Sequence, residues 1–356
     1  LRLKEFFQIS SGGSQDRRIL LLTLEGEGLQ GWGECVASAD PSYAYETTDT
    51  SWHVLTDFIL PSVVGTELHS PEAVLDPVWW IRGHGMAKAA VEMASWDMAA
   101  RADGVSLSQK IGGVRDRVPV GVSVGIKDTD EELHDQVQGF IEDGYARVKI
   151  KVKPGRDVDM LSGLCERFPD TVFMADANSA YTLADVDIFK ALDPLDLLMI
   201  EQPLRYDDFL HHARLQEQIE TPVCLDESIK TEWDTELALE LKSCQVINIK
   251  PGRVGGLSTS CRIHDMMEDA GLAVWCGGML ESGVGRAHNV ALASLPNFTL
   301  PGDISASSRY WDRDIVSPEF TVEDGHMAVP TGHGIGVEVD TDFIESISTR
   351  VATFGV

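Results

Sequence analysis

Ala146-Arg147-Val148-Lys149-Ile150-Lys151-Val152 is the first of five short apolar runs in residues 145–251 that end in or contain charged residues. The other four end at Asp176, Glu201, Asp226-Glu227 and Lys250. The charged positions 151, 176, 201, 226 and 250 recur at a period of about 25 residues, the length of one strand-plus-helix unit. Because a buried parallel strand reads as a continuous apolar run, the period predicts parallel β-strands joined by helices.

The fold expected from this period is a closed barrel of parallel strands. We predict an α/β protein with a (β/α)7β TIM-type barrel over residues 113–316, in which all C-terminal strand ends surround one opening. Its first strand is expected at 118–125, its seventh at 273–277 and its last at 298–303. Helices are expected at about 156–168, 182–192, 208–219, 231–241 and 256–270.

The rest of the chain is predicted to form a second, α+β domain. Residues 1–112 have no strand-plus-helix period, but a strand at 19–24 and a return strand at 31–35 indicate a hairpin. A helix is expected at 86–101. Beyond residue 316 the pattern changes to short strands and turns, so we expect 317–356 to join the domain formed by 1–112.

The acids at the strand ends form a candidate metal site. A single acid after a strand is more often a turn residue or a helix cap, but the regular spacing favours a common role. Asp176, Glu201 and Asp226 would supply oxygen ligands from three successive strands. Such a set is expected to hold Mg²⁺, with Mn²⁺ as the alternative, and to leave positions open for a substrate.

The lysines at the same strand ends are the candidate catalytic groups. Lys149 and Lys151 are two residues apart and therefore point to the same side of their strand. Lys250 comes from further round the barrel and can approach a bound substrate from the opposite face. Like-charge repulsion between neighbouring lysines favours the neutral amine that a general base requires. We assign Lys151 as the base and Lys149 as its electrostatic partner, which also binds the substrate carboxylate.

Composition limits the functions to be considered. The net charge of −28 argues against nucleic acid or an anionic membrane as a partner. No apolar run has the length of a transmembrane helix, and the first residues lack the features of a signal peptide. The six cysteines show no paired or metal-binding spacing, so we expect reduced thiols in a cytoplasmic protein.

Several motifs resemble those of a known superfamily. The motifs Gly-Tyr-Ala-Arg-Val-Lys-Ile-Lys (144–151), Asp-Ala-Asn (176–178), Ile-Glu-Gln-Pro (200–203), Asp-Glu-Ser (226–228) and Ile-Lys-Pro-Gly-Arg-Val-Gly-Gly (249–256) are similar to the enolase superfamily, muconate-lactonising-enzyme subgroup. Cys-Gly-Gly-Met-Leu-Glu-Ser-Gly-Val-Gly-Arg-Ala (276–287) and Leu-Pro-Gly-Asp-Ile-Ser-Ala-Ser (300–307) resemble the o-succinylbenzoate synthase / N-succinylamino acid racemase family. The similarity covers nearly the whole chain.

This resemblance implies a capping domain and a small-molecule carboxylate substrate. Residues 87–97 resemble the capping domain of the superfamily, whose loops close over the barrel opening. Residues 7–15 and 38–43 are the candidate loops, and we also expect a homo-oligomer. Further candidates for substrate binding, or for support of the groups that bind it, are Ser123, Asn178, Glu227, Arg253, Gly278, Met279 and Glu281. Arg253 is expected to lower the pKa of Lys250, and Glu281 either contacts the substrate or shapes its loop.

The expected chemistry is metal-dependent abstraction of a proton α to a carboxylate. A divalent ion and a nearby lysine neutralise the charge of the enediolate that forms. The resemblance implies two reactions, dehydration to o-succinylbenzoate in menaquinone biosynthesis and racemisation of an N-succinylamino acid. In the dehydration Lys250 steadies the enediolate, whereas in the racemisation it exchanges acid and base roles with Lys151.

Four alternatives stay open at this point. A muconate-type cycloisomerase would use overlapping residues. A dipeptide epimerase is disfavoured because Gly-Met-Leu-Glu-Ser (278–282) stands where an Asp-x-Asp pair is usual. In different classes, the chain would be a non-catalytic barrel that retains the site, or a Schiff-base aldolase that uses one lysine without a metal.

Overall fold

Residues 1–9 and 12–355 are described by a computed structural model, and within them seven parallel strands form the curved sheet of the barrel. The sheet order is β12-β11-β10-β9-β8-β7-β6, so neighbours in sequence are neighbours in space. The strands are β6 (Val122–Val124), β7 (Val148–Lys151), β8 (Phe173–Asp176), β9 (Ile200–Glu201), β10 (Val223–Leu225), β11 (Val246–Ile249) and β12 (Ala273–Cys276). Every residue of β6 to β11 is buried, as their apolar composition predicts.

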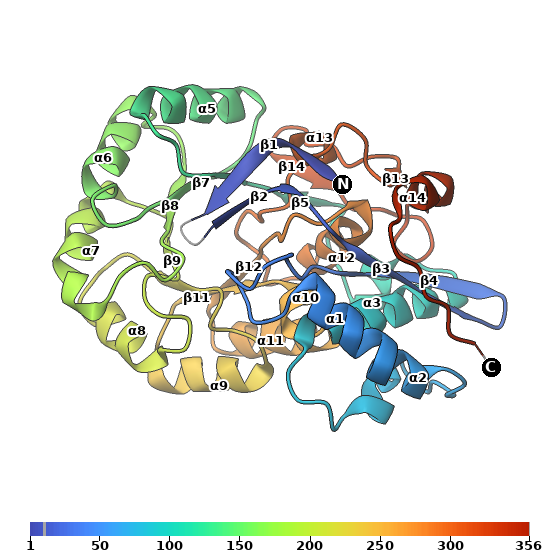
Figure 1. The fold of residues 1–356 in the computed structure, drawn as a ribbon. Coiled ribbons are helices and arrows are strands. Elements are labelled where there is room, and N and C mark those ends of the chain that lie inside the picture. Colours follow the sequence, from blue (N-terminus) through green and yellow to red (C-terminus); the bar gives the residue numbers. More distant parts are fainter. Residues whose placement is uncertain (10–11, 356) are drawn as a thin grey trace.

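Helices cover the outside of this sheet (Figure 1). They are α5 (Asp130–Glu142), α6 (Val158–Arg167), α7 (Val186–Leu192), α8 (Phe209–Gln216), α9 (Glu232–Leu241), α10 (Pro251–Val254), α11 (Leu257–Asp269) and α12 (Gly283–Ala293), with short 3₁₀ turns η3 (Leu183–Asp185) and η4 (Asp193–Leu195) beside α7. In α5, Thr129 caps the first turn, and Leu133, Val137 and Phe140 bury one face. The alternation of strand and helix from β7 to β12 confirms the predicted α/β barrel.

The barrel closes through a segment that is less regular than predicted. Residues 298–303 were expected to form the last strand, but they make single bridges, Val274 with Phe298 and Val120 with Gly302. The expected first strand at 118–125 is interrupted at Gly121, where a Cβ would lie 2.6 Å from the Arg147 guanidinium carbon. Its first part, β5 (Arg117–Pro119), instead pairs with β14 (His326–Ala328).

The N-terminal part of the chain forms a separate layer, drawn in blue to teal in Figure 1. Its elements are β1 (Arg2–Ile9), β2 (Gly12–Asp16), β3 (Leu20–Gly26), β4 (Leu29–Cys35), α1 (Thr48–Val54), η1 (Leu55–Ile59), α2 (Leu60–Val63), η2 (Glu72–Val78), α3 (Gly85–Ala102) and α4 (Leu107–Ile111). The β3–β4 hairpin and α3 confirm two predictions. The prediction of a loop at 7–15 was wrong, because β1 and β2 pair as an antiparallel hairpin; residues 10 and 11 lie outside the described chain.

The C-terminal tail returns to the N-terminal layer. It contains α13 (Ser307–Tyr310), β13 (Val316–Ser317), β14, β15 (Glu338–Val339) and α14 (Thr341–Ile347). The Leu107 N–H donates to Gly334 O at 2.6 Å, and the Ile335 N–H donates to Asp97 Oδ1 at 2.7 Å. These contacts are those expected of a tail that joins 1–112, although the domain boundaries themselves remain predictions.

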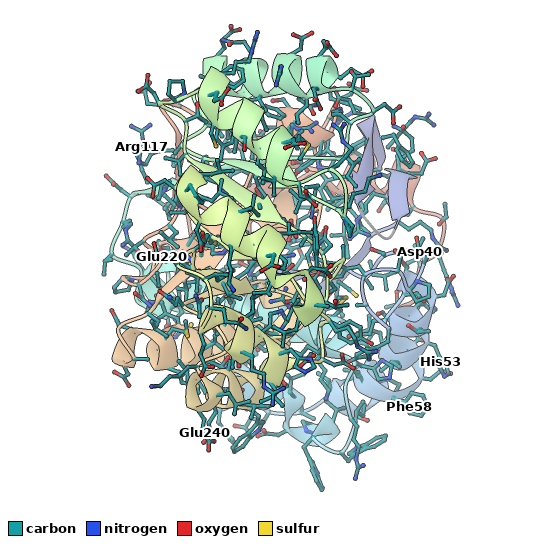
Figure 2. All side chains as sticks on the ribbon, turned by 90° about the vertical axis from the view of Figure 1, so that its left-hand side faces the viewer. Asp40, His53, Phe58, Arg117, Glu220 and Glu240 are labelled. Carbon is teal, nitrogen blue, oxygen red and sulfur yellow. The ribbon has the colours of Figure 1, made fainter. Side chains whose placement is uncertain are left out.

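Figure 2 shows the barrel helices from outside, with the N-terminal layer along the side where Asp40, His53 and Phe58 are labelled.

Two buried glutamates attach this layer to the barrel. Glu34 of β4 accepts from the Gly285 N–H of α12 at 2.9 Å. Glu92 of α3 accepts from the N–H groups of Leu257 and Ser258 in α11, at 2.7 and 2.9 Å. A carboxylate is stabilised at the start of a helix, where backbone N–H groups are otherwise unpaired.

A glycine substitution tests the close packing of β4 on α3. A Cβ at Gly33 would lie 1.9 Å from Ala90 O, whereas one at Gly26, in the same hairpin, would meet nothing within 4 Å. We expect Gly33→Ala to lower the free energy of unfolding by about 1–3 kcal/mol or more, and Gly26→Ala to change it much less. Chemical denaturation of both variants measures this; equal stabilities would contradict the packing argument.

A second substitution tests the buried Glu34 carboxylate. Burial raises the pKa of Glu34 from 4.5 to about 7, so between these values the folded protein holds a proton that the unfolded chain has lost. This group therefore stabilises the fold at low pH, and its contribution falls as pH rises, by at most about 1.4 kcal/mol per pH unit. Glu34→Gln lacks this dependence.

The stability advantage of the wild type over Glu34→Gln should consequently shrink between pH 5 and pH 8. Urea unfolding of both proteins at the two pH values measures the difference. Glu27→Gln, at an exposed turn residue, controls for loss of one carboxylate. An advantage that stays constant or grows with pH would contradict the assignment.

Candidate active site

The strand register brings Lys151, Asp176 and Glu201 into a single row. In the parallel ladder Lys151 lies opposite Asp176, and Asp176 lies opposite Glu201. Glu201 in turn lies opposite Cys224, two residues before Asp226. β7, β8 and β9 end at Lys151, Asp176 and Glu201, and Asp226 and Lys250 directly follow β10 and β11. Parallel strands end on one side of a barrel, so these side chains lie at the same end.

A cavity of about 140 Å³ lies at these strand ends. Eight of the predicted site residues line it: Ser123, Lys149, Lys151, Asn178, Asp226, Lys250, Gly278 and Met279. The other five are buried but do not line it: Asp176, Glu201, Glu227, Arg253 and Glu281. The N-terminal layer contributes Arg17, Arg18 and residues of the segment 38–43 to the opposite wall. The cavity is therefore enclosed by both parts of the chain.

Lys151 lies at one end of the acid row. Its Nζ lies 2.6 Å from Asp176 Oδ2 and donates to Asn178 Oδ1 at 2.6 Å. The Asn178 amide donates to Glu227 Oε1 at 3.0 Å. The ammonium groups of Lys151 and Lys149 outweigh burial, which alone would raise the pKa of Asp176, and lower it to about 2. Asn178 thus contacts Lys151 directly, and Glu227 contacts it through Asn178.

Lys149 is surrounded by carboxylates. Its Nζ lies 2.9 Å from Asp303, 3.0 Å from Glu201 and 3.3 Å from Asp176, and 5.1 Å from the centre of the Trp275 ring. Burial alone would lower the pKa of Lys149, but these acids raise it well above its usual value. The like-charge repulsion expected between the neighbouring lysines is therefore outweighed at Lys149, which is held as a cation.

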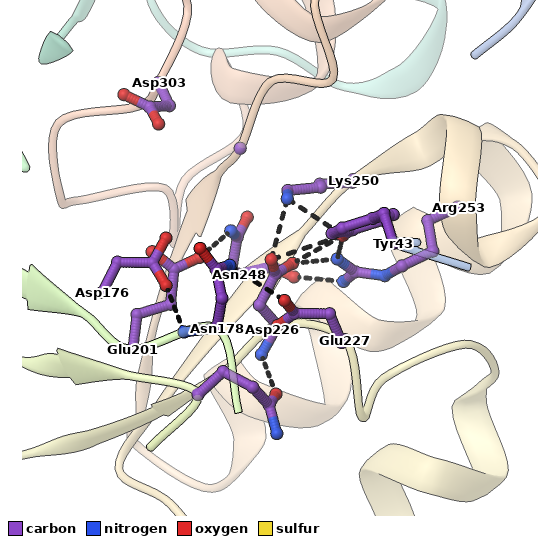
Figure 3. Close-up of polar contacts among 12 residues, drawn as sticks. Tyr43, Asp176, Asn178, Glu201, Asp226, Glu227, Asn248, Lys250, Arg253 and Asp303 are labelled. Carbon is purple, nitrogen blue, oxygen red and sulfur yellow. Dashed lines mark hydrogen bonds and ion pairs between the residues drawn. The ribbon is translucent and has the colours of Figure 1, made fainter. Parts of the chain in front are cut away.

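Lys250 directly follows β11, which lies four strands further round the sheet than β7, the strand that ends at Lys151. Its Nζ lies 2.8 Å from Asp226 Oδ2 and 3.1 Å from the Tyr43 hydroxyl. Arg253 also pairs with Asp226, and Figure 3 shows Lys250, Arg253 and Tyr43 gathered around this acid. Burial lowers the pKa of Lys250, and Arg253 lowers it as expected, but the charge of Asp226 outweighs both, so the net shift is upward.

The three acids fit a divalent cation in their chemistry. All are buried carboxylates, and burial with the nearby Asp176 charge raises the pKa of Glu201 to about 8. A bound divalent cation would therefore stabilise the negative charges of the three carboxylates. Carboxylates are also the ligands that Mg²⁺ or Mn²⁺ prefers.

The ligand oxygens of these three acids do not all lie within 4.8 Å of one another in this structure, and their role as ligands stays a prediction. Within residues 1–9 and 12–355, the ligand atoms of three such side chains lie within 4.8 Å of one another only at His264, Asp265 and Glu268. The reason is that lysines, Arg253 and Asn248 bind the oxygens of the three acids and hold them in separate ion pairs. Ligation would require these pairs to loosen.

The remaining predicted residues differ in their contacts. Ser123 Oγ is buried without a hydrogen-bond partner in the described residues and lines the cavity, so it is available to a bound ligand. Glu281 Oε1 accepts from the Asn289 amide at 2.9 Å, which favours the loop-shaping interpretation. Gly278 packs closely against the backbone of Asp303, because a Cβ at position 278 would lie 2.5 Å from Asp303 O.

Three residues of the site were missed by the sequence analysis. Asn248 donates to Glu201 Oε1 at 2.7 Å, and its spacing of two from Lys250 on one strand was a usable signal. Asp303 pairs with Lys149 and is the last residue of the expected strand 298–303, so its position at a strand end was also a usable signal. Tyr43 lies in the N-terminal layer, and nothing in the periodicity indicates its contact with Lys250.

Comparison with known proteins shows the family of the chain. Residues 132–343 match the family model "Enolase C-terminal domain-like", and residues 2–112 match "Mandelate racemase / muconate lactonizing enzyme, N-terminal domain". The chain belongs to the enolase superfamily. Within this superfamily it belongs to the group of o-succinylbenzoate synthases and N-succinylamino acid racemases, which confirms the resemblance found in the motifs.

The relatives of this superfamily member cover almost all of its length. An o-succinylbenzoate synthase of Geobacillus stearothermophilus is 50% identical, over 99% of this chain and 95% of its own. An N-succinylamino acid racemase of Thermus thermophilus is 48% identical, over 98% and 94%. A crystal structure of an enolase superfamily member from Listeria innocua has a TM-score of 0.95 and 41% identity, covering 98% of this chain and 95% of its own.

Proposed function

We propose that the chain is an o-succinylbenzoate synthase, which dehydrates 2-succinyl-6-hydroxy-2,4-cyclohexadiene-1-carboxylate in menaquinone biosynthesis. The observation that supports this most directly is the placement of Lys151 and Lys250. They belong to β7 and to the end of β11, on either side of the strands that bear the acids. In a chain 50% identical to an o-succinylbenzoate synthase, this arrangement suits proton transfer beside a bound carboxylate.

Asp176, Glu201 and Asp226 would hold the divalent cation, with Mg²⁺ as the proposed ion. When bound, the cation supplies positive charge to the substrate carboxylate and so stabilises the enediolate dianion. Lys149, held as a cation by its acid neighbours, contributes a second positive charge on the same side. The substrate is an anion and the protein has a net charge of −28, so this local positive charge is needed to attract it.

Lys151 is the proposed base. It takes the proton α to the carboxylate, which breaks the C–H bond, and then returns this proton to the departing hydroxyl group. The C–O bond breaks, water leaves and a ring double bond forms, so that atoms and charges balance. Asn178, which accepts a hydrogen bond from Lys151, keeps the amine directed toward the cavity between the two transfers.

N-succinylamino acid racemisation is a second candidate activity. The 48% identity to a Thermus thermophilus racemase and the enclosed position of Lys250 favour it. Lys151 would remove the α-proton from one enantiomer, and Lys250 would deliver a proton to the opposite face. In the dehydration, by contrast, Lys250 remains protonated and steadies the enediolate by its charge.

The setting proposed for this activity is the cytoplasm, in a homo-oligomer. All six cysteines are free thiols, and four of them are buried, as expected in a reducing compartment. Among the described residues no helix combines the length and the apolar character needed to cross a membrane.

Exchange of the substrate α-proton with deuterated water tests the two lysine roles. With N-succinylamino acid enantiomers offered separately, Lys151→Ala and Lys250→Ala should each lose exchange with a different enantiomer, because each variant retains one base. Proton magnetic resonance measures the exchange, and the wild type should exchange both. Lys151→Ala should also lose dehydration by about 10²–10⁴-fold. Loss of exchange with the same enantiomer in both variants would contradict opposed bases.

Removal of one acid tests the cation site. Asp226→Asn should weaken Mg²⁺ and Mn²⁺ binding by at least about tenfold, because a neutral amide is a poorer ligand than a carboxylate. Isothermal titration calorimetry measures the affinity without any substrate. Asp49→Asn, at an exposed residue that pairs with Arg18, is the matched control. Equal affinities in wild type and Asp226→Asn would remove Asp226 from the ligand set.

A further inference from the structure

Arg17 connects parts of the cavity wall that are far apart in the sequence. It follows β2, is 5% exposed and lines the cavity. Its Nη1 donates to Ala37 O at 3.3 Å, and its Nη2 donates to Val36 O and, at 3.0 Å, to Met279 O. Val36 and Ala37 follow β4, whereas Met279 lies in the barrel segment between β12 and α12. One guanidinium group therefore joins the N-terminal layer to the barrel.

The partners of Arg17 indicate a positioning role. Among the described residues, its hydrogen bonds go to main-chain carbonyls and to Ser38 Oγ at 3.4 Å, and its Nε is buried without a partner. Burying a guanidinium group costs free energy when carbonyls alone receive its hydrogen bonds. The planar group presents its donors in a fixed fork, so both carbonyl-bearing segments must keep a fixed separation.

The segments that Arg17 joins both contribute to the cavity lining. Residues 36–37 lead directly into the segment that contains Ser38, Asp40 and Tyr43, all of which line the cavity. Tyr43 reaches Lys250, 3.1 Å away. On the barrel side, Met279 and its neighbour Leu280 line the same cavity. The hydrogen bonds of Arg17 thus set the distance between segment 36–43, which contains Tyr43, and segment 277–282 of the barrel.

We propose that Arg17 is a positioning residue for substrate binding, which fixes segment 36–43 against segment 277–282 so that the substrate is enclosed above the lysines. It acts through main-chain carbonyls and does not touch the reacting atoms. The kinetic part of this inference rests on the proposed function, whereas the structural part does not.

Hydrogen–deuterium exchange of the ligand-free protein tests the structural part. In Arg17→Met, peptides covering 36–43 and 277–282 should both exchange at least about threefold faster than in the wild type. Arg115→Met is the matched control, because Arg115 also binds main-chain carbonyls, those of Leu295 and Pro296, and does not line the cavity. It should leave both peptides unchanged.

Arg17→Lys provides a second variant. It keeps the charge but loses the fork, so it should give a smaller increase in both segments. If Arg17→Met does not fold, Arg17→Lys is judged by the same criterion. Unchanged exchange of either segment in the folded variant would overturn the inference.

Steady-state kinetics test the functional part. Arg17→Met should raise KM at least about tenfold and change kcat by less than about threefold, since the enclosure is loosened while the lysines and acids are intact. Arg115→Met should show the wild-type KM. A lowered kcat with unchanged KM would overturn the positioning role. If the wild type itself does not turn over the substrate, the proposed function fails, and the exchange experiment still decides whether Arg17 joins the two segments.

Discussion

Compensation of charge inside the barrel is the constraint on which the site depends. Asp176, Glu201, Asp226 and Asp303 are all buried, and a negative charge on any of them costs free energy there unless cations lie nearby. The register of the parallel strands supplies those cations, because Lys151 lies opposite Asp176 and Lys149 lies within 3.3 Å of three acids. The same ion pairs that stabilise the fold at this end also hold the lysines and acids that the proposed reaction uses. When a cation and an anionic substrate bind, the acids therefore exchange lysine partners for the cation, and the lysines exchange acid partners for the substrate.

The sequence predicted the barrel and most of its strand ends because both are consequences of burial. A strand covered on both faces has to be apolar, and the charged residue after it marks the exit from the interior, so Lys151, Asp176, Glu201 and Lys250 could be located by spacing alone. Irregular segments could not be located this way. Residues 298–303 keep only single bridges, and the first strand breaks at Gly121, where the Arg147 guanidinium leaves no room for a Cβ.

Properties that depend on several distant side chains were beyond the pattern. The raised pKa of Lys250 results from the balance of burial, Asp226 and Arg253, and only the coordinates give the distances that decide this balance. Tyr43 contacts Lys250 across 207 residues of chain, and no local periodicity reports such a contact. The acids were correctly expected on neighbouring strands, but their hydrogen bonds to lysines and Asn248 depend on side-chain conformations that spacing does not specify.

Glu34 and Glu92, which bind the first turns of α12 and α11, have a consequence for recombination between relatives. Glu34 and Glu92 belong to the N-terminal layer, yet the groups that satisfy them, the N–H groups of Gly285, Leu257 and Ser258, belong to the barrel. In a hybrid that combines the first third of this chain with another barrel, Glu34 and Glu92 would keep their hydrogen bonds only if the helices of the new barrel begin at the same places. Otherwise the hybrid would bury carboxylates without partners. Inheritance of the two parts is therefore linked through backbone geometry, and substrate preference in the N-terminal layer would be expected to change together with its barrel.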